Sequence, residues 1–449
     1  MNKVLTVFSG LLLFAGSHAL AQRICGAQLV KESIIAQHPE AAEKIERQRL
    51  SLQGIADRYK AEHGGTMAMK TTAAASAVPV VFHIIVNAAQ LAELGGADGV
   101  ARRCDSQIAV LNRDYNRANS DSIYILPGFK PLYSSVGIQF GLAKLTPTGA
   151  PAAGYEIRVI SNDGFNGSST TYTNAKHYAT NGLDSWDVTK YLNVWCINFL
   201  DYPGLIGLTV APSFVDSGWN INGDQGVALT YNVFGAREAG TDNYPANFDE
   251  GRSLTHEIGH FFEIWHPWGD DGGLCPPPGP GIDDGIADTP PEGNNASGSP
   301  TGPVFDACSP SGNGIMWMNY MDYCNDNAVH MFTRDQAAVM AAQVAPGGES
   351  HSLTQNPAIL AVRENTILDD LGIFPNPTTG VINVTFNSAK NELSDIYVMD
   401  VTGREAGHID ATNQQKDFYS IDLSGMSKGI YFVRCNFASG SITRKIVLQ

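Results

Sequence analysis

The sequence predicts an α/β domain with a twisted sheet and a metal-binding helix, followed by a small all-β sandwich. Three observations support this fold class. Strand-like and helix-like segments alternate between about residues 78 and 355. Three histidines lie with Glu257 in the short segment 256–266, and short strands of alternating hydrophobicity occupy residues 371–449. A chain of 449 residues is long enough to bury a separate core in each unit.

The first 21 residues have the pattern of a secretory signal peptide. Lys3 provides the positive start, residues 4–15 form a short apolar core, and Ala19-Leu20-Ala21 is a small-residue cleavage site. No later segment reaches the roughly 18 uninterrupted apolar residues that a spanning helix needs. We therefore expect an exported protein whose mature form has no transmembrane segment. The net charge of −16 argues against nucleic acid as a partner, because no basic stripe is available to neutralise phosphates.

Residues 22–77 have the features of a removable prosegment. They include Cys25, directly after the expected signal cleavage, and a low-complexity stretch at residues 64–77 that is suited to proteolysis. A cysteine thiolate is a good metal ligand, so Cys25 in a removable segment is a candidate to block a metal site reversibly. A disulfide partner or an uninvolved cysteine is the alternative interpretation of Cys25.

The segment from His256 to His266 has the spacing of a catalytic zinc site. On a helix, His256 and His260 share one face and both rings can reach the same ion. Glu257 then lies beside the metal, where a general base for the attacking water belongs. His266 can reach that ion only if the helix ends between it and His260. Three neutral histidines and an open fourth position are typical of catalytic zinc.

One position departs from the full pattern H-E-x-x-H-x-x-G-x-x-H, because Glu263 stands where the pattern has glycine. We expect the chain to leave the helix there through a left-handed conformation, which costs a residue with a Cβ about 1–2 kcal/mol. For a bare H-E-x-x-H the alternative is an amphipathic core helix with incidental histidines. The third histidine argues against that alternative.

Downstream, residues 319–323 form a candidate Met-turn, and together with the zinc segment they make the chain resemble the pappalysin family of metzincin peptidases. The resemblance extends to residues 78–85, 107–115 and 191–195. It implies an α/β zincin (metzincin) fold, with Met321 beneath the metal and Tyr323 stabilising the oxyanion of the tetrahedral intermediate. Core packing is the alternative role for Met321 and Tyr323. Motifs similar to the one around Cys25 occur in pappalysin-like proforms.

Strand and helix patterns divide the catalytic domain, expected at residues 78–355, into elements. The strand candidates are residues 80–86, 136–142, 192–199 and 226–231, and the helix candidates are residues 106–117 and 252–262. We expect the strand at 226–231 to lie at the edge of the sheet. An extended peptide substrate could pair with such a strand by strand addition.

The loop after the zinc segment is rich in Gly, Pro and Asp. The resemblance implies a disulfide between Cys275 and Cys308, and it leaves Cys104, Cys196, Cys324 and Cys435 without an assigned role. It also implies that calcium binds in this loop. Clustered carboxylates repel one another unless a cation or solvent screens them, so the calcium candidates are Asp283, Asp284 and Asp288. A solvated acidic loop is the alternative.

After a linker at residues 356–370, short alternating strands in residues 371–449 predict a small immunoglobulin-like β-sandwich. This region resembles the C-terminal sorting domain of proteins exported by type IX secretion, with Pro375-Asn376-Pro377, Gly429-Ile430-Tyr431 and residues 445–448 in the expected order. The resemblance implies the type IX machinery as a partner and an extracellular or surface-attached location, reached through the periplasm. An accessory or carbohydrate-binding sandwich is the alternative.

Together these observations predict a secreted zinc-dependent endopeptidase that acts on proteins or peptides. Glu257 is the expected general base, and Cys25 the expected inhibitor of a zymogen. Two other functions stay open. One is a surface binding protein with a degenerate protease fold, and the other is a zinc hydrolase acting on non-peptide amides.

Overall fold

The chain divides into two compact units, Met1–Ala361 and Val362–Gln449. The computed structural model describes residues 24–63, 77–166, 172–202, 204–214, 224–237, 244–270, 273–275, 283–360, 371–385, 393–401, 404–411, 418–437 and 440–449. The predicted signal peptide, most of the predicted cleavable stretch and linker residues 361–370 lie outside these ranges.

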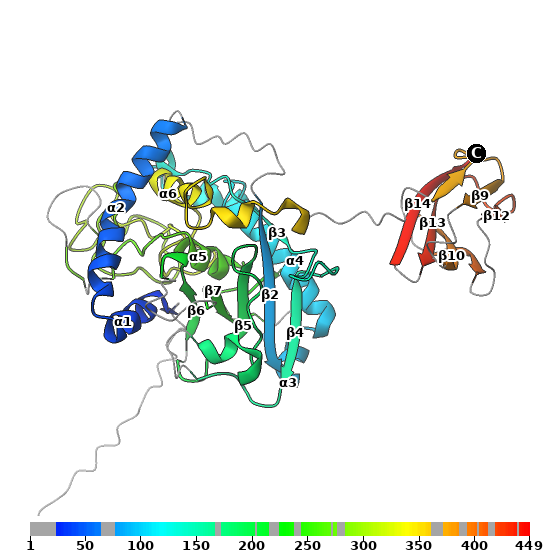
Figure 1. Ribbon diagram of the computed structural model, residues 1–449. Coiled ribbons are helices and arrows are strands. Elements are labelled where there is room, and N and C mark those ends of the chain that lie inside the picture. Colours follow the sequence, from blue (N-terminus) through cyan, green and yellow to red (C-terminus); the bar gives the residue numbers. More distant parts are fainter. Residues whose placement is uncertain are drawn as a thin grey trace, which may run out of the picture. The chain divides into compact units, whose positions relative to one another are not determined.

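The first unit is built on one mixed sheet, whose described strands follow the order β1-β6-β7-β5-β2-β3, with β4 also paired to β2 (Figure 1). These strands are β1 (Ile24–Cys25), β2 (Ala77–Asn87), β3 (Gln139–Leu142), β4 (Tyr155–Ile160), β5 (Leu192–Ile197), β6 (Leu205–Val210) and β7 (Gly226–Thr230). β2 pairs in parallel with β3, β4 and β5, and β5 with β7. β5 is buried at every position, as is usual for a strand covered on both faces.

The predicted edge position of the strand at 226–231 is wrong. β7 lies between β5 and β6, with Val227 opposite Val194 and Ala228 opposite Leu208. β6 runs antiparallel to β7 and pairs on its other side with β1, from the N-terminal segment. All of β6 is buried, so it lacks the alternation by which a sequence reveals a strand, and Gly207 weakens its strand propensity.

Helices pack around this sheet in the first unit (Figure 1). The α-helices are α1 (Ala27–Gln37), α2 (Ala41–Glu62), α3 (Ala88–Glu93), α4 (Gly96–Asp114), α5 (Arg252–Phe261) and α6 (Arg334–Val344). The short 3-10 helices are η1 (Ser120–Tyr124), η2 (Lys130–Leu132), η3 (Thr173–Lys176), η4 (Tyr178–Thr180), η5 (Pro212–Phe214), η7 (His351–Thr354) and η8 (Pro357–Ile359). Capping boxes begin α3 at Asn87 and α6 at Thr333. Among the described helices, none is both long and apolar enough to cross a membrane.

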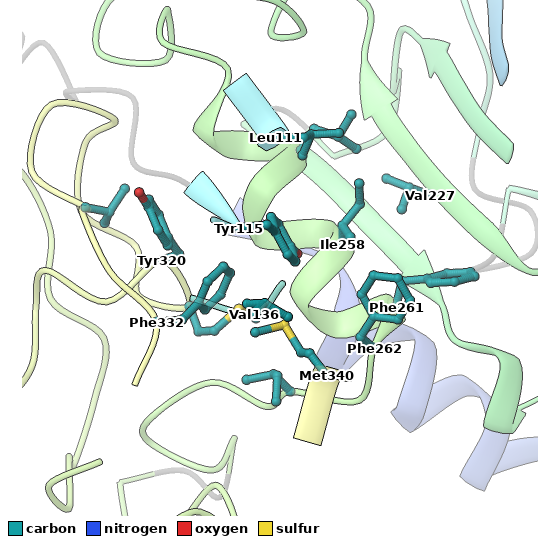
Figure 2. Close-up of a cluster of buried hydrophobic side chains, with 14 of the residues drawn as sticks. Leu111, Tyr115, Val136, Val227, Ile258, Phe261, Phe262, Tyr320, Phe332 and Met340 are labelled. Atoms are coloured by element: carbon teal, nitrogen blue, oxygen red, sulfur yellow. The ribbon is translucent and has the colours of Figure 1, made fainter. Parts of the chain in front are cut away.

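The main core surrounds α5, which is buried along its whole length. Figure 2 shows Ile258, Phe261 and Phe262 among apolar side chains from α4, β7, α6 and the loop that contains Tyr320. The Tyr115 hydroxyl at the end of α4 also donates a 3.1 Å hydrogen bond to the Thr255 carbonyl of α5. Truncating a buried side chain such as Ile258 to alanine typically costs about 2–5 kcal/mol. Packing therefore fixes where α5 presents its polar side chains.

The N-terminal segment, residues 24–63, is an integral part of this unit. Leu52 and Tyr59 of α2 belong to the main core, and Val30 and Ile34 of α1 belong to a second core beside β6. α2 also packs along α6. The segment therefore covers apolar surface of the rest of the first unit.

The second unit is an all-β sandwich of two antiparallel sheets in the described residues, with orders β11-β10-β13-β14 and β12-β9-β8. Its strands are β8 (Gly372–Phe374), β9 (Val381–Thr385), β10 (Leu393–Asp400), β11 (Glu405–Asp410), β12 (Phe418–Asp422), β13 (Gly429–Phe437) and β14 (Gly440–Leu448). Ile382, Ile396, Val433 and Ile446 from both sheets are fully buried in its core. The immunoglobulin-like topology expected from the sequence stays a prediction.

Candidate active site

The three histidines of the zinc segment converge at the end of α5. His260 Nε2 lies 3.2 Å from His256 Nε2 and 3.0 Å from His266 Nε2. The Cys25 sulfur joins them, and the four ligand atoms all lie within 4.8 Å of one another. These four residues form a group of buried metal-ligand side chains from two distant parts of the sequence.

A turn at Glu263 makes this convergence possible. Glu263 has φ 74°, its amide donates to the His260 carbonyl (2.9 Å), and the Ile264 amide donates to the Gly259 carbonyl (3.0 Å). These two hydrogen bonds define a Schellman motif, in which glycine is the usual left-handed residue. The helix therefore ends between His260 and His266, through the left-handed conformation that the sequence predicts.

Hydrogen bonds to the far side of each ring fix the imidazole tautomers. His256 Nδ1 lies 2.8 Å from the Tyr320 carbonyl, His260 Nδ1 2.7 Å from the Ile264 carbonyl, and His266 Nδ1 2.6 Å from Asp270 Oδ1. A carbonyl or carboxylate oxygen can only accept, so each Nδ1 carries the proton.

The Nε2 lone pairs consequently point at one another across about 3 Å. Burial, with the neighbouring His266 and Lys31, lowers the pKa of His260 well below its usual value, which favours the neutral ring. Three facing lone pairs repel unless a cation lies between them. The donor set and its tautomers therefore fit a zinc ion.

Cys25 is held in this site through its backbone as well as its sulfur. The Tyr323 hydroxyl accepts from the Cys25 amide (3.2 Å) and donates to the Cys25 carbonyl (3.3 Å), while the Ala27 amide donates to Cys25 Sγ (3.3 Å). Burial, then the nearby charge of Glu257, raises the pKa of the Cys25 thiol. A cation beside the sulfur has the opposite effect, because it favours the thiolate.

Met321 and Tyr323 both lie near the histidine cluster, Met321 against Gly259 of α5 and Tyr323 against the rings of His256 and His266. A Cβ on Gly259 would lie 2.3 Å from Met321 Sδ, so glycine in α5 allows this close approach. The Tyr323 ring packs edge-on against His266 (5.0 Å) and Trp268 (4.8 Å). Met321 therefore supports the helix, and Tyr323 borders the metal site.

Asp270 and Trp268 also hold His266, although the sequence patterns did not indicate either residue for this role. The Trp268 ring is stacked on His266 at 4.4 Å with an interplanar angle of 5°. Asp270 accepts from His266 through one oxygen and from Lys31 of α1 through the other (2.8 Å). The spacing of Asp270, four residues after His266, is a signal for such a carboxylate–histidine pair.

The predicted calcium residues lie in a loop against α2. The Asp283 carbonyl accepts from Arg49 (2.7 Å), Asp284 accepts from Thr289 (2.9 Å), and Asp288 accepts from the Asp335 amide (3.1 Å). Burial, and then the Asp283 and Asp288 charges, raises the pKa of Asp284 well above its usual value. These three carboxylates do not converge as the histidine cluster does within the described residues.

The predicted disulfide between Cys275 and Cys308 is present. The other cysteines in the described ranges, Cys104, Cys196, Cys324 and Cys435 together with Cys25, are buried thiols outside any disulfide. The disulfide ties the loop that follows the zinc segment to the chain before the Met-turn.

The fold and the three-histidine site define a metallopeptidase of the metzincin type. Residues 173–345 match the family described as pregnancy-associated plasma protein-A, and residues 372–449 match the secretion system C-terminal sorting domain. An extracellular metalloprotease of Arthroderma otae is 32% identical over 150 residues, which cover 33% of this chain and 49% of that protein. The chain thus matches about half the length of this relative.

Two solved structures match over most of their length. A promirolysin variant of Tannerella forsythia is 28% identical with a TM-score of 0.61, covering 75% of this chain and 99% of that one. Mature Tannerella forsythia mirolysin in complex with a cleaved peptide is 30% identical with a TM-score of 0.55, covering 64% and 97%. This chain belongs to the pappalysin family of metallopeptidases. Its sorting domain places it outside the cell or on the cell surface.

Proposed function

We propose that this protein is a zinc-dependent endopeptidase for protein or peptide substrates, made as a zymogen that Cys25 keeps inactive. One observation carries the proposal: the Cys25 sulfur lies among the three imidazoles, within 4.8 Å of their nitrogens. Family membership supports the hydrolase class, and the tautomers of the three histidines suit a divalent zinc ion.

His256, His260 and His266 would hold the zinc. When bound, zinc supplies a Lewis acid that polarises a carbonyl and makes water acidic enough to lose its proton near neutral pH. The protein supplies the remaining chemistry. Glu257 takes the proton from the attacking water and passes it to the leaving amine.

Tyr323 serves as a hydrogen-bond donor to the oxygen that becomes negative during attack. Burial, then the Cys25 and Asp270 charges, raises the pKa of Tyr323 well above its usual value, so its hydroxyl keeps the proton that it must donate. In this structure the hydroxyl is engaged by the Cys25 backbone. Release of residue 25 would free the hydroxyl and the fourth metal position together.

The prosegment also occupies the sheet edge beside the site. β1 pairs in parallel with β6, and the Gly26 amide donates to the Gly207 carbonyl (2.8 Å). A bound peptide could use the same backbone groups of β6 by strand addition. In this proposal two contacts cause latency: the Cys25 sulfur binds the zinc, and β1 occupies the side of β6 where a substrate would pair.

The test compares matured wild-type protein with Glu257→Gln on casein and on a peptide library. We expect wild-type hydrolysis that a chelator abolishes and zinc restores, and a Glu257→Gln protein that keeps zinc but loses turnover at least a thousandfold. Retained turnover in Glu257→Gln would contradict its role as base. Cleavage of non-peptide amides alone, or peptide binding without cleavage, would favour one of the two other functions.

A separate measurement tests latency. The Cys25→Ala variant, purified with an intact prosegment, should show peptide cleavage that the wild-type zymogen lacks. Equal inactivity of both zymogens would show that strand pairing, and not the sulfur, blocks the site.

The domain boundaries are part of the same proposal. They are a signal peptide at 1–21, a prosegment at 22–77, a catalytic domain at 78–355, a linker at 356–370 and a sorting domain at 371–449 that engages the type IX machinery.

We also propose calcium binding by Asp283, Asp284 and Asp288, supported by the burial of Asp283 and Asp284. Calcium should raise the melting temperature of zinc-loaded protein, and an unchanged value would exclude this site.

A further inference from the structure

Glu257 of α5 is contacted by the neighbouring strand β6. Thr209 Oγ1 lies 2.8 Å from Glu257 Oε2 and 2.9 Å from the Glu257 carbonyl oxygen, and both residues are buried. A hydroxyl has one proton, so it donates to one of these acceptors at a time. The ionised carboxylate is the stronger acceptor, and the carbonyl has its helical partner in the amide of residue 261.

A second residue of the same strand shapes the space for this carboxylate. A Cβ on Gly207 would lie 2.7 Å from Glu257 Oε1 and 2.8 Å from both Glu257 Cδ and Cγ. These separations are below any real Cβ contact, and the Glu257 side chain would have to move. β6 therefore provides a gap at residue 207 and a donor two residues later, at residue 209.

We propose that Thr209 and Gly207 are positioning residues that hold the Glu257 carboxylate in its reactive orientation. The inference rests on the proposed role of Glu257 as general base. General-base catalysis depends on a carboxylate within hydrogen-bond reach of the proton that it abstracts. A carboxylate that rotates freely about its side-chain bonds spends less time in that geometry. Loss of the positioning contacts should therefore lower kcat more than it weakens substrate binding.

This arrangement makes β6 a strand with two roles. Its backbone is available for pairing with an extended chain, as the Gly26–Gly207 hydrogen bond shows. Gly207, which has no side chain, leaves room for the Glu257 carboxylate, and the Thr209 hydroxyl donates to it. A change in Thr209 could therefore act through peptide binding instead, and the experiment must separate these effects.

The first measurement is steady-state kinetics of matured Thr209→Val, which replaces the hydroxyl by a methyl group of similar size. We expect kcat to fall about tenfold, KM to stay within twofold, and zinc content to stay unchanged. Thr209→Ser keeps the donor and should recover most of the lost kcat. The control is Thr230→Val on neighbouring β7. It removes a hydroxyl that donates a 2.6 Å hydrogen bond to the Leu205 carbonyl of β6. This control should keep wild-type kcat.

The second measurement is peptide affinity in the inactive Glu257→Gln background, where adding Thr209→Val should change Kd less than twofold. Wild-type kcat in Thr209→Val, an equal loss in Thr209→Ser, or a tenfold weaker Kd would each overturn the proposal. Gly207→Ala should lower kcat further with zinc retained, and full activity there would also contradict it. Glu257→Gln tests the proposed base independently, so failure of that role is distinguishable from failure of this inference.

Discussion

Glu263 occupies the turn that brings His266 back toward α5, at φ 74°. Its side chain is buried, accepts a hydrogen bond from Gln48 of α2, and burial raises its pKa to about 7. A glutamate at a glycine position thus carries backbone strain, while its side chain provides a contact to the prosegment. In the proposed maturation this contact would be lost together with α2, whereas the strain at residue 263 would remain.

The strain predicts a stability difference between two variants of the mature protein. Glu263→Gly and Glu263→Ala both remove the carboxylate, but only glycine relieves the left-handed conformation. We expect Glu263→Gly to be about 1 kcal/mol more stable than Glu263→Ala, a shift of about 2 °C by calorimetry. Zinc content should be equal in both. An alanine variant as stable as the glycine variant would show that the turn is unstrained.

At the residue scale, local spacing predicted that His256, Glu257 and His260 lie close together, because they fall within little more than one turn of a helix. The contribution of Asp270 and Thr209 could not be read in the same way. Asp270 lies only four residues after His266, but whether its carboxylate meets the ring depends on how the chain folds after α5. Thr209 reaches Glu257 across a sheet-to-helix contact between residues far apart in sequence. The roles of Asp270 and Thr209 depend on tertiary contacts, which local sequence patterns do not predict.

At the element scale, α5 could be predicted from the sequence, whereas β6 could not. α5 was predicted at residues 252–262 and extends over Arg252–Phe261, because its amphipathic pattern and ligand spacing are local properties. β6 is a buried run with a glycine, and its place beside β7 depends on antiparallel pairing that no local pattern encodes. The strand that was not predicted, β6, is the one that pairs with β1 of the N-terminal segment and contacts Glu257.

Two ion pairs of the N-terminal helices differ in their burial and in the elements that they connect. Lys31 of α1 forms a 2.8 Å ion pair with Asp270, with side-chain exposures of 10% and 4%, and its ammonium lies 3.2 Å from the Trp265 ring centroid. Arg47 of α2 pairs with Glu43 of the same helix at exposures of 69% and 80%. A buried pair that crosses between elements contributes to docking, whereas an exposed pair within one helix contributes little.

This contrast predicts how the zymogen responds to loss of each pair. Lys31→Met keeps the apolar stem but leaves Asp270 without its ammonium partner, so α1 should dock less firmly. In a Glu257→Gln background, trace active enzyme should remove this prosegment at least fivefold faster than the parent one, followed by gel electrophoresis. Arg47→Ala should be processed at the parental rate. Equal rates for both variants would show that the Lys31 pair does not contribute to latency.

At the scale of the whole molecule, the candidate active site lies in the first unit and the sorting domain is the second unit. The first unit contains the cluster of Cys25 and the three histidines and has its own buried cores, and the second unit has a separate buried core. Each unit therefore has what an independently folding domain requires. The acidic balance of the chain, with a net charge of −16, suits a protein that stays dissolved outside the cell.

Independent cores predict that removing the second unit affects export but not catalysis. A chain ending at residue 361 keeps every residue that we place in the active site, so after maturation its kcat/KM and zinc content should match those of the full chain. In a bacterium with type IX secretion, the truncated protein should accumulate in the periplasm because it lacks the sorting domain. Fractionation and zymography of the same cultures measure both effects. Secretion of the truncated chain would contradict the sorting role, and loss of its purified activity would show that the two units depend on each other.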